Sequence, residues 1–458
     1  MKKLILLVFV SIFLLIPNYQ SDLNSIPNTG DEIQYWEIGY GIFSSGEYKR
    51  EIINSSIDEN SKFELGYRRG EPIYPLLIAS VVRINNLFNE VSTENCSSID
   101  CSVFDEEVAS LVFLAHLFKL IIILMVYTTL KSQYSYPVSA GLTLTLLLML
   151  PAEYKDLITV LLLTLGIHFY YKKKLLGLSF LSLLPLSNAV FLYILPAVFI
   201  VYFLLKKNNV KNSIITLLIL LIPSMIWMGR NYSTVNQFSI TGRASEILSI
   251  RAEYSTNSFN QIGAGYIYYT PARPFIFGAI QGKFWNYVTE SGSDVVYNRS
   301  NSQSSYRMAK ELTGVVGSKL KSKNYGSSSY VEQQQILNTV SINLIKENFP
   351  QHLLLSTVFG YRGMFPSINF NFIDFYSFPK SISLLIKEIF SFLRLFFIPY
   401  GLVKSIINLL SKKTSLCSLL LIILWGFFAT LTHFIPRYAT YLLIPAVLFV
   451  ANIDKEEI

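Results

Sequence analysis

An acidic pair follows the first apolar segment of the chain and precedes an aromatic residue. The pair is Asp31 and Glu32, and Tyr35 comes one helical turn later. A carboxylate just outside a membrane can take the proton of a hydroxyl group that reacts at the membrane surface, and we assign this role of general base to Asp31. Glu32 could orient the base or the acceptor. The alternative for Asp31 is a solvated loop carboxylate or the N-cap of an interfacial helix, a position that aspartate favours.

A basic motif opens a later apolar stretch. Residues 68–75 read Arg-Arg-Gly-Glu-Pro-Ile-Tyr-Pro, so two arginines precede a proline-rich turn that contains Tyr74. The planar guanidinium group of arginine binds phosphate oxygens through paired hydrogen bonds. Arg69 is the first candidate for a phosphate ligand, followed by Arg68, Arg230 and Arg437. For each one alone, the alternative is an interfacial side chain that contacts lipid headgroups. Together the acidic and basic motifs suggest a transferase that uses a lipid-phosphate substrate.

The composition predicts a polytopic membrane protein. Hydrophobic residues make up 52% of the 458 residues, and charged residues make up only 15%. A membrane helix needs about 20 apolar residues to cross a hydrocarbon core about 30 Å thick. Segment 4–16 resembles a signal peptide but lacks a clear cleavage site, so we interpret it as a retained anchor. The predicted spans are 4–16, 109–130, 136–150, 157–171, 175–187, 189–205, 213–228, 386–410, 416–431 and 438–450.

Lysine positions predict the topology. The lysines at 2, 3, 131, 172–174, 206, 207, 211, 412 and 413 all fall on one side of this arrangement. The positive-inside rule makes that side cytoplasmic. Basic clusters at both ends of the uncharged stretch 175–205 predict a hairpin that breaks near Pro185, Ser187 and Asn188. Both termini then face the cytoplasm, and segments 18–107 and 230–383 lie outside. The later segment contains one apparent helix, 330–347.

The predicted fold class is therefore an all-α polytopic membrane protein with about 10–11 transmembrane helices and two large extracytoplasmic loops. We divide the chain into residues 1–260, a transmembrane catalytic region whose first external loop is 18–107; residues 261–383, an extracytoplasmic subdomain; and residues 384–458, the C-terminal transmembrane helices.

Other classes of site have weaker support. The net charge of +8 is largely explained by lysines in short cytoplasmic turns, so we expect no nucleic-acid partner. Cys96 and Cys101 either form a small-loop disulfide or stay free. Glu153 and Asp156 flank a lysine and form an incomplete site for a divalent cation, with helix capping or donor positioning as alternatives. The four histidines have no zinc-binding spacing, and the identity of any metal is unknown.

These motifs resemble the GT-C class of integral-membrane glycosyltransferases, which includes protein O-mannosyltransferases and the bacterial lipid A aminoarabinose transferases. Members carry an acidic residue or pair and an aromatic residue in the first external loop, similar to Asp31, Glu32 and Tyr35. They also carry an Arg-Pro-x-Tyr-Pro-like turn, similar to residues 69–75. Weaker matches in the same order are residues 151–154, 223–232 and 433–438. The likeness covers most of the first 260 residues and then only the C-terminal turn.

The resemblance implies an inverting transfer of a sugar from a polyprenyl-phosphate donor to a hydroxyl group of a lipid, glycan or protein. It implies a site on the periplasmic side of a bacterial inner membrane, with Arg69 and its companions holding the leaving phosphate. One alternative is an O-antigen-type polysaccharide polymerase or ligase. Its arginines would come from the late loop, where Arg243, Arg251, Arg273 and Arg362 are available. Another is a lipid-linked-sugar flippase that uses Lys119 and the break at 185–188.

Overall fold

The computed structural model describes residues 2–25, 30–50, 59–88, 105–151, 154–207, 209–321, 328–411, 413, 415–432 and 438–451. Every regular element in these ranges is helical, and none of the described residues forms a strand. The predicted all-α class is confirmed.

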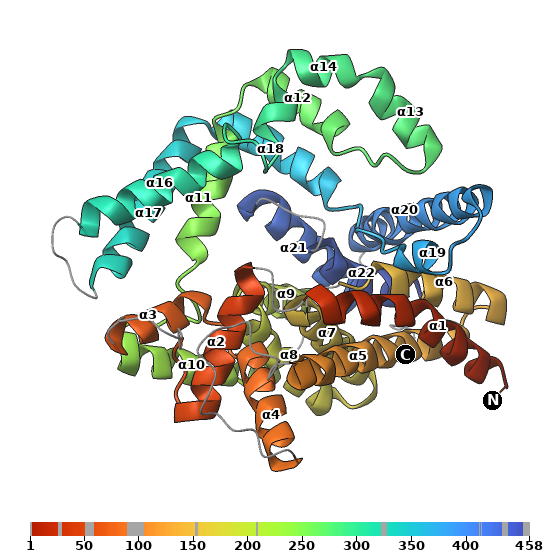
Figure 1. Cartoon of the computed structure of the whole chain (residues 1–458), viewed down its shortest axis with the longest axis horizontal. Coiled ribbons are helices and arrows are strands. Elements are labelled where there is room, and N and C mark those ends of the chain that lie inside the picture. Colours follow the sequence, from red (N-terminus) through yellow and green to blue (C-terminus); the bar gives the residue numbers. More distant parts are fainter. Residues whose placement is uncertain are drawn as a thin grey trace.

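The first ten helices form the lower layer in Figure 1. They are α1 (Lys2–Ser25), α2 (Gly30–Ser45), α3 (Glu59–Arg69), α4 (Ile73–Phe88), α5 (Asp105–Lys131), α6 (Tyr136–Met149), α7 (Tyr154–Lys172), α8 (Lys174–Ser187), α9 (Phe191–Lys206) and α10 (Val210–Val235). The last three helices, α20 (Lys380–Leu410), α21 (Leu416–Leu431) and α22 (Ala439–Val450), lie between this layer and the upper one.

The upper layer comes from the predicted late extracytoplasmic segment. It contains α11 (Ala244–Ser255), α12 (Phe259–Tyr268), α13 (Phe275–Lys283), α14 (Trp285–Glu290), α15 (Ser293–Val296), α16 (Ser305–Lys321), α17 (Ser328–Glu347) and α18 (Phe349–Arg362), and α19 (Asn371–Phe375) follows it. The sequence predicts only one of these helices, 330–347, which is α17. Most of the others have 14 or fewer residues, and only α16, Ser305–Lys321, is of comparable length; its apolar periodicity was missed in the sequence.

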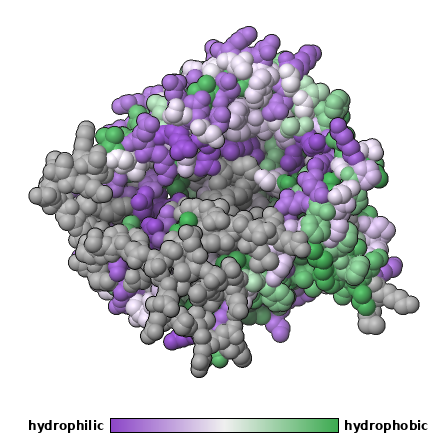
Figure 2. Space-filling model, viewed as in Figure 1, coloured by the Kyte–Doolittle hydropathy of each residue, from purple (hydrophilic) through white to green (hydrophobic). Residues whose placement is uncertain are grey.

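All ten predicted apolar segments coincide with helices. Among the described residues, two helical stretches are long and apolar enough to cross a membrane, Val108–Lys131 and Val210–Val235. Most of the other apolar helices are shorter, and α20, although it has 31 residues, is not among the candidate spans. Figure 2 shows hydrophobic residues gathered at the lower right, over the helices around α1, α5 and α6, while hydrophilic residues spread over the upper layer. The number of spans and their direction stay predictions.

The predicted break between the two uncharged helices is confirmed. Helix α8 ends at Ser187, and Asn188 leaves the helical conformation with φ −152° and ψ 112°. Its backbone N–H still bonds to the carbonyl oxygen of Leu184 at 2.8 Å. Pro185 lies inside the last turn of α8, so the helix breaks where the sequence predicts.

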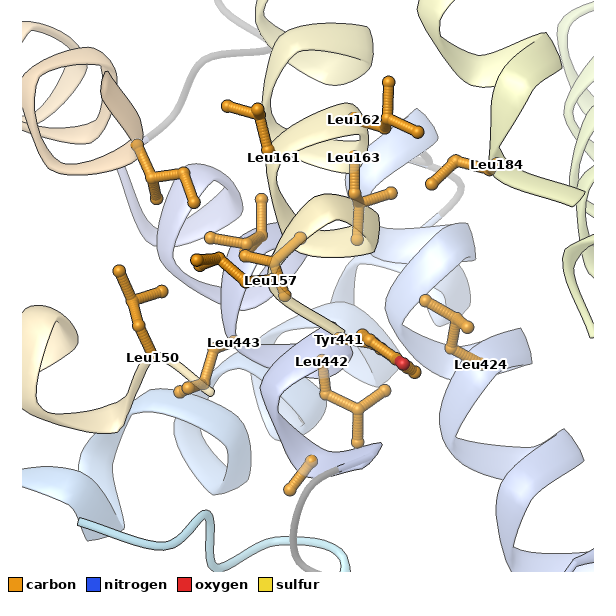
Figure 3. Packing of buried hydrophobic residues seen from close by; sticks show 14 of the residues in the cluster. Leu150, Leu157, Leu161, Leu162, Leu163, Leu184, Leu424, Tyr441, Leu442 and Leu443 are labelled. Carbon is orange, nitrogen blue, oxygen red and sulfur yellow. The ribbon is translucent and has the colours of Figure 1, made fainter. Parts of the chain in front are cut away.

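Helix α7 lies at the centre of the core and contacts α4, α5, α8 and α22. Figure 3 shows Leu157, Leu161 and Leu163 of α7 surrounded by side chains from α8, α21 and α22, among them Leu184, Leu424 and Tyr441. Gly177 lets α8 approach α7 closely, because a Cβ there would meet the backbone of Tyr170. The core therefore fixes the start of α7, where Lys155 and Asp156 lie.

Candidate functional site

A cavity of about 660 Å³ lies where the first helices, the start of α7 and the upper layer meet. It is lined by residues of α2, the α3–α4 turn, α7, the α8–α9 break, α9 to α11, α16, α17 and α21. Its charged lining residues are Arg68, Lys155, Arg243, Arg299 and Lys310, which are basic, and Glu71, Asp156 and Glu246, which are acidic. A volume of this size suits a small organic group, and the excess of basic side chains favours an anionic one.

A hydrogen-bonded ion pair stands in the wall of this cavity. The ammonium group of Lys155 lies 3.0 Å from the Glu71 carboxylate, with the two side chains 16% and 8% exposed. The hydroxyl group of Tyr35 donates to the same carboxylate oxygen of Glu71 at 3.2 Å. We call these three residues the Glu71 cluster. It joins three separate parts of the sequence, since Tyr35 comes from α2, Glu71 from the turn after α3, and Lys155 from α7.

The protonation states in the Glu71 cluster follow from burial and charge. Burial raises the pKa of Tyr35 to about 12, and the Glu71 carboxylate adds to this shift, so the phenol stays protonated at neutral pH and can donate. Burial alone would lower the pKa of Lys155. The adjacent Glu71 carboxylate and the other neighbours of Lys155 together raise this pKa by more than burial lowers it. The pKa of Lys155 is therefore raised above its ordinary value, and its ammonium group stays charged.

The turn that carries Glu71 is clamped to the loop that follows α10. The Trp227 indole donates to the carbonyl oxygen of Gly70 at 3.0 Å, and the Thr241 hydroxyl donates to that of Arg68 at 3.0 Å. Gly70 has φ +54°, and a Cβ there would lie 2.6 Å from the Cα of Thr241. Only glycine fits both this conformation and this close approach.

We expect Gly70→Ala to destabilise the protein by about 2–4 kcal/mol, because it adds both a left-handed backbone cost and a steric clash. The measurement is the thermal unfolding temperature in detergent, followed by size-exclusion chromatography. Gly46→Ala is the matched control, since Gly46 has φ +75° but no atom within 4 Å of an added Cβ. Equal losses in the two variants would mean that the approach of the 239–242 loop does not constrain Gly70.

Asp156 is buried at the cavity and bonded to the C-terminal helices. It accepts a hydrogen bond from the hydroxyl group of Tyr441 on α22. The Tyr441 oxygen accepts another from the side-chain amide of Asn188 at 3.1 Å. Asp156 and Asn188 both line the cavity. This chain of hydrogen bonds therefore holds the start of α7, the α8–α9 break and α22 together around the site.

The upper wall of the cavity is basic. Glu246 of α11 lies 2.7 Å from the guanidinium group of Arg68 and 3.7 Å from the ammonium group of Lys310. Arg299 stacks on the ring of Tyr306, with 4.0 Å between the guanidinium carbon and the ring centroid. Glu246 is thus shared by two cations from α3 and α16. A rigid aromatic platform beside a guanidinium group is well suited to a flat, polar and anionic ligand.

The structure brings some of the predicted site residues together. Tyr35, Arg68 and Asp156 line the cavity. Tyr74 packs next to it, with its ring centroid 5.5 Å from that of Tyr35 and 6.3 Å from that of Tyr154, but it is not a lining residue.

Arg230 lies outside the cavity lining. Its guanidinium group donates to the carbonyl oxygen of Tyr48 and to the side chain of Asn231, both at 3.0 Å. It also stacks over the rings of Tyr48 and Trp227, at 5.4 and 5.2 Å from their centroids. These contacts join α10 to the segment between α2 and α3. The geometry gives Arg230 a structural role beside the site.

Other predicted residues fall at the edge of the described structure or outside it. Asp31 and Glu32 lie in the first turn of α2, about one turn before Tyr35, but their side chains lie outside the described part. The same holds for the side chain of Arg69, at the end of α3. Residues outside the described ranges altogether are Glu153, Arg437, Cys96 and Cys101.

Several cavity residues were not predicted as site residues. Glu71 stands inside the basic motif and Lys155 stands between two acidic residues, so both carried a signal in the sequence. Glu246, Arg299 and Lys310 carried none, because their positions depend on how the upper layer folds over α3. Within the described ranges, no group of three or more His, Cys, Asp or Glu side chains could hold a metal ion. The predicted cation site at Glu153 and Asp156 stays untested.

The arrangement can bind an anionic group at its cationic side chains and accept hydrogen bonds at the Asp156 and Glu71 carboxylates. Comparisons of the chain with protein-family models, curated proteins and solved structures found no match.

Proposed function

We propose that this chain is an integral-membrane glycosyltransferase of the GT-C type. It transfers a sugar from a polyprenyl-phosphate donor to a hydroxyl group of a lipid, glycan or protein on the extracytoplasmic face of a bacterial inner membrane. The observation that carries the proposal is the cavity, in which residues from the first-loop motifs, Tyr35, Arg68 and Glu71, meet cationic side chains of the later segments.

The proposed reaction is a single displacement. Asp31 takes the proton of the acceptor hydroxyl as its oxygen attacks the anomeric carbon of the donor sugar. The bond from that carbon to the phosphate oxygen breaks, and polyprenyl phosphate leaves with the electron pair. The anomeric centre is inverted because the acceptor enters opposite the leaving group. A general base at the start of α2 is compatible with this geometry, since Asp31 lies about one turn before a cavity residue, Tyr35.

Cationic side chains stabilise the leaving phosphate. Arg68, Arg243, Arg299 and Lys310 are the described candidates in the cavity, and Arg69 is adjacent in sequence. Preorganised cations stabilise developing negative charge most effectively where water is limited. Arg243 immediately precedes α11 at the cavity wall, so it takes the place that Arg230 held in the prediction from sequence.

The membrane arrangement is supported by the exposed surface of the long helices. On α10, Leu218 is 52% exposed, Ile222 49% and Ile226 70%. Such a surface is unfavourable in water and suits lipid. The lysine clusters are predicted on the cytoplasmic side of the membrane. We therefore place the opening of the cavity on the extracytoplasmic side.

A polysaccharide polymerase or ligase is the second candidate, and Arg243 is the observation that favours it, because a late-segment arginine lies in the cavity. The other three arginines considered for that function lie elsewhere. Arg251 bonds to His352 and Ser356, Arg273 pairs with Glu388, and Arg362 stacks on Tyr269. A polymerase would not require the carboxylate of Asp31.

The test measures transfer from a panel of radiolabelled polyprenyl-phosphate sugars in membranes that carry the chain, with lipid, glycan and peptide acceptors. We expect one donor to label an acceptor, and Arg243→Gln to reduce the rate by about 100-fold. Arg83→Gln is the matched control, because Arg83 is exposed on α4 and does not line the cavity. A folded wild-type chain that transfers no sugar from any donor would overturn the proposal.

A further inference from the structure

Helix α13 presents its apolar side chains to the outside of the protein. Phe275 is 77% exposed, Ile276 67% and Ile280 47%, and no residue of this helix is buried. The exposed surface continues through Phe284 and Trp285 at the start of α14. In Figure 1, α13 extends to the upper right, away from the remaining upper helices, and Figure 2 shows hydrophobic residues at this place.

One of the two polar side chains of α13, Gln281, is turned towards the protein, and the other, Lys283, is exposed. The side-chain amide of Gln281 donates to the carbonyl oxygens of Ile267 and Tyr268, at 3.3 and 3.2 Å. A surface helix of a water-soluble protein has apolar residues towards the core and polar residues towards solvent. On α13 the exposed outer surface is instead mostly apolar, which indicates an apolar medium or partner on that side.

Three polar contacts anchor the start of α13 to α20. Arg273 pairs with Glu388 of α20 at 3.0 Å, and the backbone N–H of Phe275 donates to the same carboxylate at 2.6 Å. Arg394, also on α20, donates to the carbonyl oxygen of Arg273 at 2.8 Å. The start of α13 therefore lies beside α20 around residue 388.

Helix α20 itself carries a long exposed apolar stripe. Its members follow one another at spacings of three and four residues, which places them on one face of the helix. They are Ile382, Leu385, Ile389, Phe392, Phe396, Tyr400, Val403, Ile407 and Leu410. The stripe is about 42 Å long at 1.5 Å per residue, close to the full thickness of a bilayer with its interfacial regions. A stripe of this length matches a lipid surface.

We propose that α13 and the start of α14 insert into the boundary between headgroups and acyl chains in the extracytoplasmic leaflet. The inference rests on the membrane arrangement proposed above and not on the sugar transfer. Glu388 lies near the start of α20, the end that the lysine pattern predicts on the extracytoplasmic side. Helix α13 therefore meets the membrane at the outer surface of the bilayer. Phe284, Trp285 and the adjacent Lys283 have the composition of an interfacial helix end.

The consequence is a second attachment of the upper layer to the membrane. Helix α12, which precedes α13, packs against α18, and α18 packs against α21 beside the cavity. Insertion of α13 therefore fixes the height of the upper wall of the cavity above the bilayer.

The test uses the full chain with its three native cysteines replaced, reconstituted in nanodiscs of phosphatidylethanolamine and phosphatidylglycerol. A nitroxide label is attached to Ile276→Cys on α13, and its collision rates with oxygen and with a water-soluble nickel chelate are measured. Ile226→Cys on α10 is the membrane control, and Gln335→Cys, exposed on α17, is the aqueous control. We expect the oxygen-to-nickel ratio at 276 to be several-fold higher than at 335 and to approach that at 226.

A nickel-accessible label at 276 beside a lipid-exposed label at 226 would overturn the insertion of α13 and leave the membrane proposal intact. A nickel-accessible label at 226 would overturn the membrane arrangement itself, and the insertion with it. A third outcome is a low collision rate of the label at 276 with both reagents, together with a measurable dipolar distance between the labels of two chains. A second copy of the chain would then cover α13, and this would overturn the lipid assignment.

Discussion

Asp31→Asn is expected to lower the rate of sugar transfer by about 10²- to 10⁴-fold while leaving the protein folded. Asparagine has nearly the same shape as aspartate, but it cannot accept the proton of the acceptor hydroxyl. Because the cavity cations that would hold the donor phosphate are unchanged, the loss should appear in kcat, with little change in the KM for the donor. The measurement is the initial rate of transfer at saturating donor, with size-exclusion chromatography in detergent as the folding check.

Two further variants accompany Asp31→Asn: Glu290→Gln is the control, and Glu32→Gln tests the neighbouring carboxylate. Glu290 is exposed at the end of α14 and does not line the cavity, so its substitution should have no effect. Glu32→Gln should give an intermediate loss if this residue orients the base. Undiminished transfer by a folded Asp31→Asn protein would remove Asp31 from the mechanism and favour the polymerase.

The helices could be predicted because the signal for them is local. Segment 416–431 is apolar along its whole length and is the helix α21, Leu416–Leu431. The predicted helix 330–347 is α17, Ser328–Glu347. The first segment was predicted to end before Pro17, whereas α1 continues through this proline to Ser25. Hydropathy falls at that point, but helical structure does not have to end where hydropathy falls.

The site could be predicted only in part, because its contacts join distant parts of the chain. The first-loop motifs contributed Tyr35 and Arg68, and the acidic residues before 157 contributed Asp156. The pairing of Glu71 with Lys155 depends on how the turn after α3 packs against α7, and the sequence gives no measure of this packing.

Residue type also fails to separate structural arginines from cavity arginines. Arg230 and Arg243 stand near each other in sequence, on either side of the clamp formed by residues 239–242. Arg230 points to backbone and aromatic partners, whereas Arg243 lines the cavity. Arg230 follows the predicted span 213–228 at its external boundary, whereas Arg243 stands further on in the predicted late external loop, so the sequence favoured Arg230 as a phosphate ligand. The path of the loop after α10, which the sequence does not give, puts Arg243 in the cavity lining instead.

Glu71→Gln is expected to destabilise the protein by about 3–5 kcal/mol, because it leaves the ammonium group of Lys155 in a largely buried position without its nearest carboxylate. The measurement is the unfolding temperature in detergent at neutral pH. Asp374→Asn is the matched control: it breaks the 3.8 Å pair between Asp374 and Lys387, whose side chains are 81% and 25% exposed. An exposed pair of this kind contributes about 0–1 kcal/mol.

The double variant Glu71→Gln, Lys155→Met separates the loss of the pair from the cost of a buried, unpaired charge. If the unpaired ammonium group causes most of the loss, the double variant should be more stable than Glu71→Gln alone. The raised pKa of Lys155 fixes the sign of the pH dependence. The contribution of the pair is complete below the ordinary pKa of lysine, about 10.4, and is lost as the pH rises through the higher folded value. If Glu71→Gln is as stable at neutral pH as Asp374→Asn, Lys155 finds sufficient compensation elsewhere, and Asp156, next to it in sequence, is the nearest candidate. The Glu71 cluster would then not hold the cavity wall.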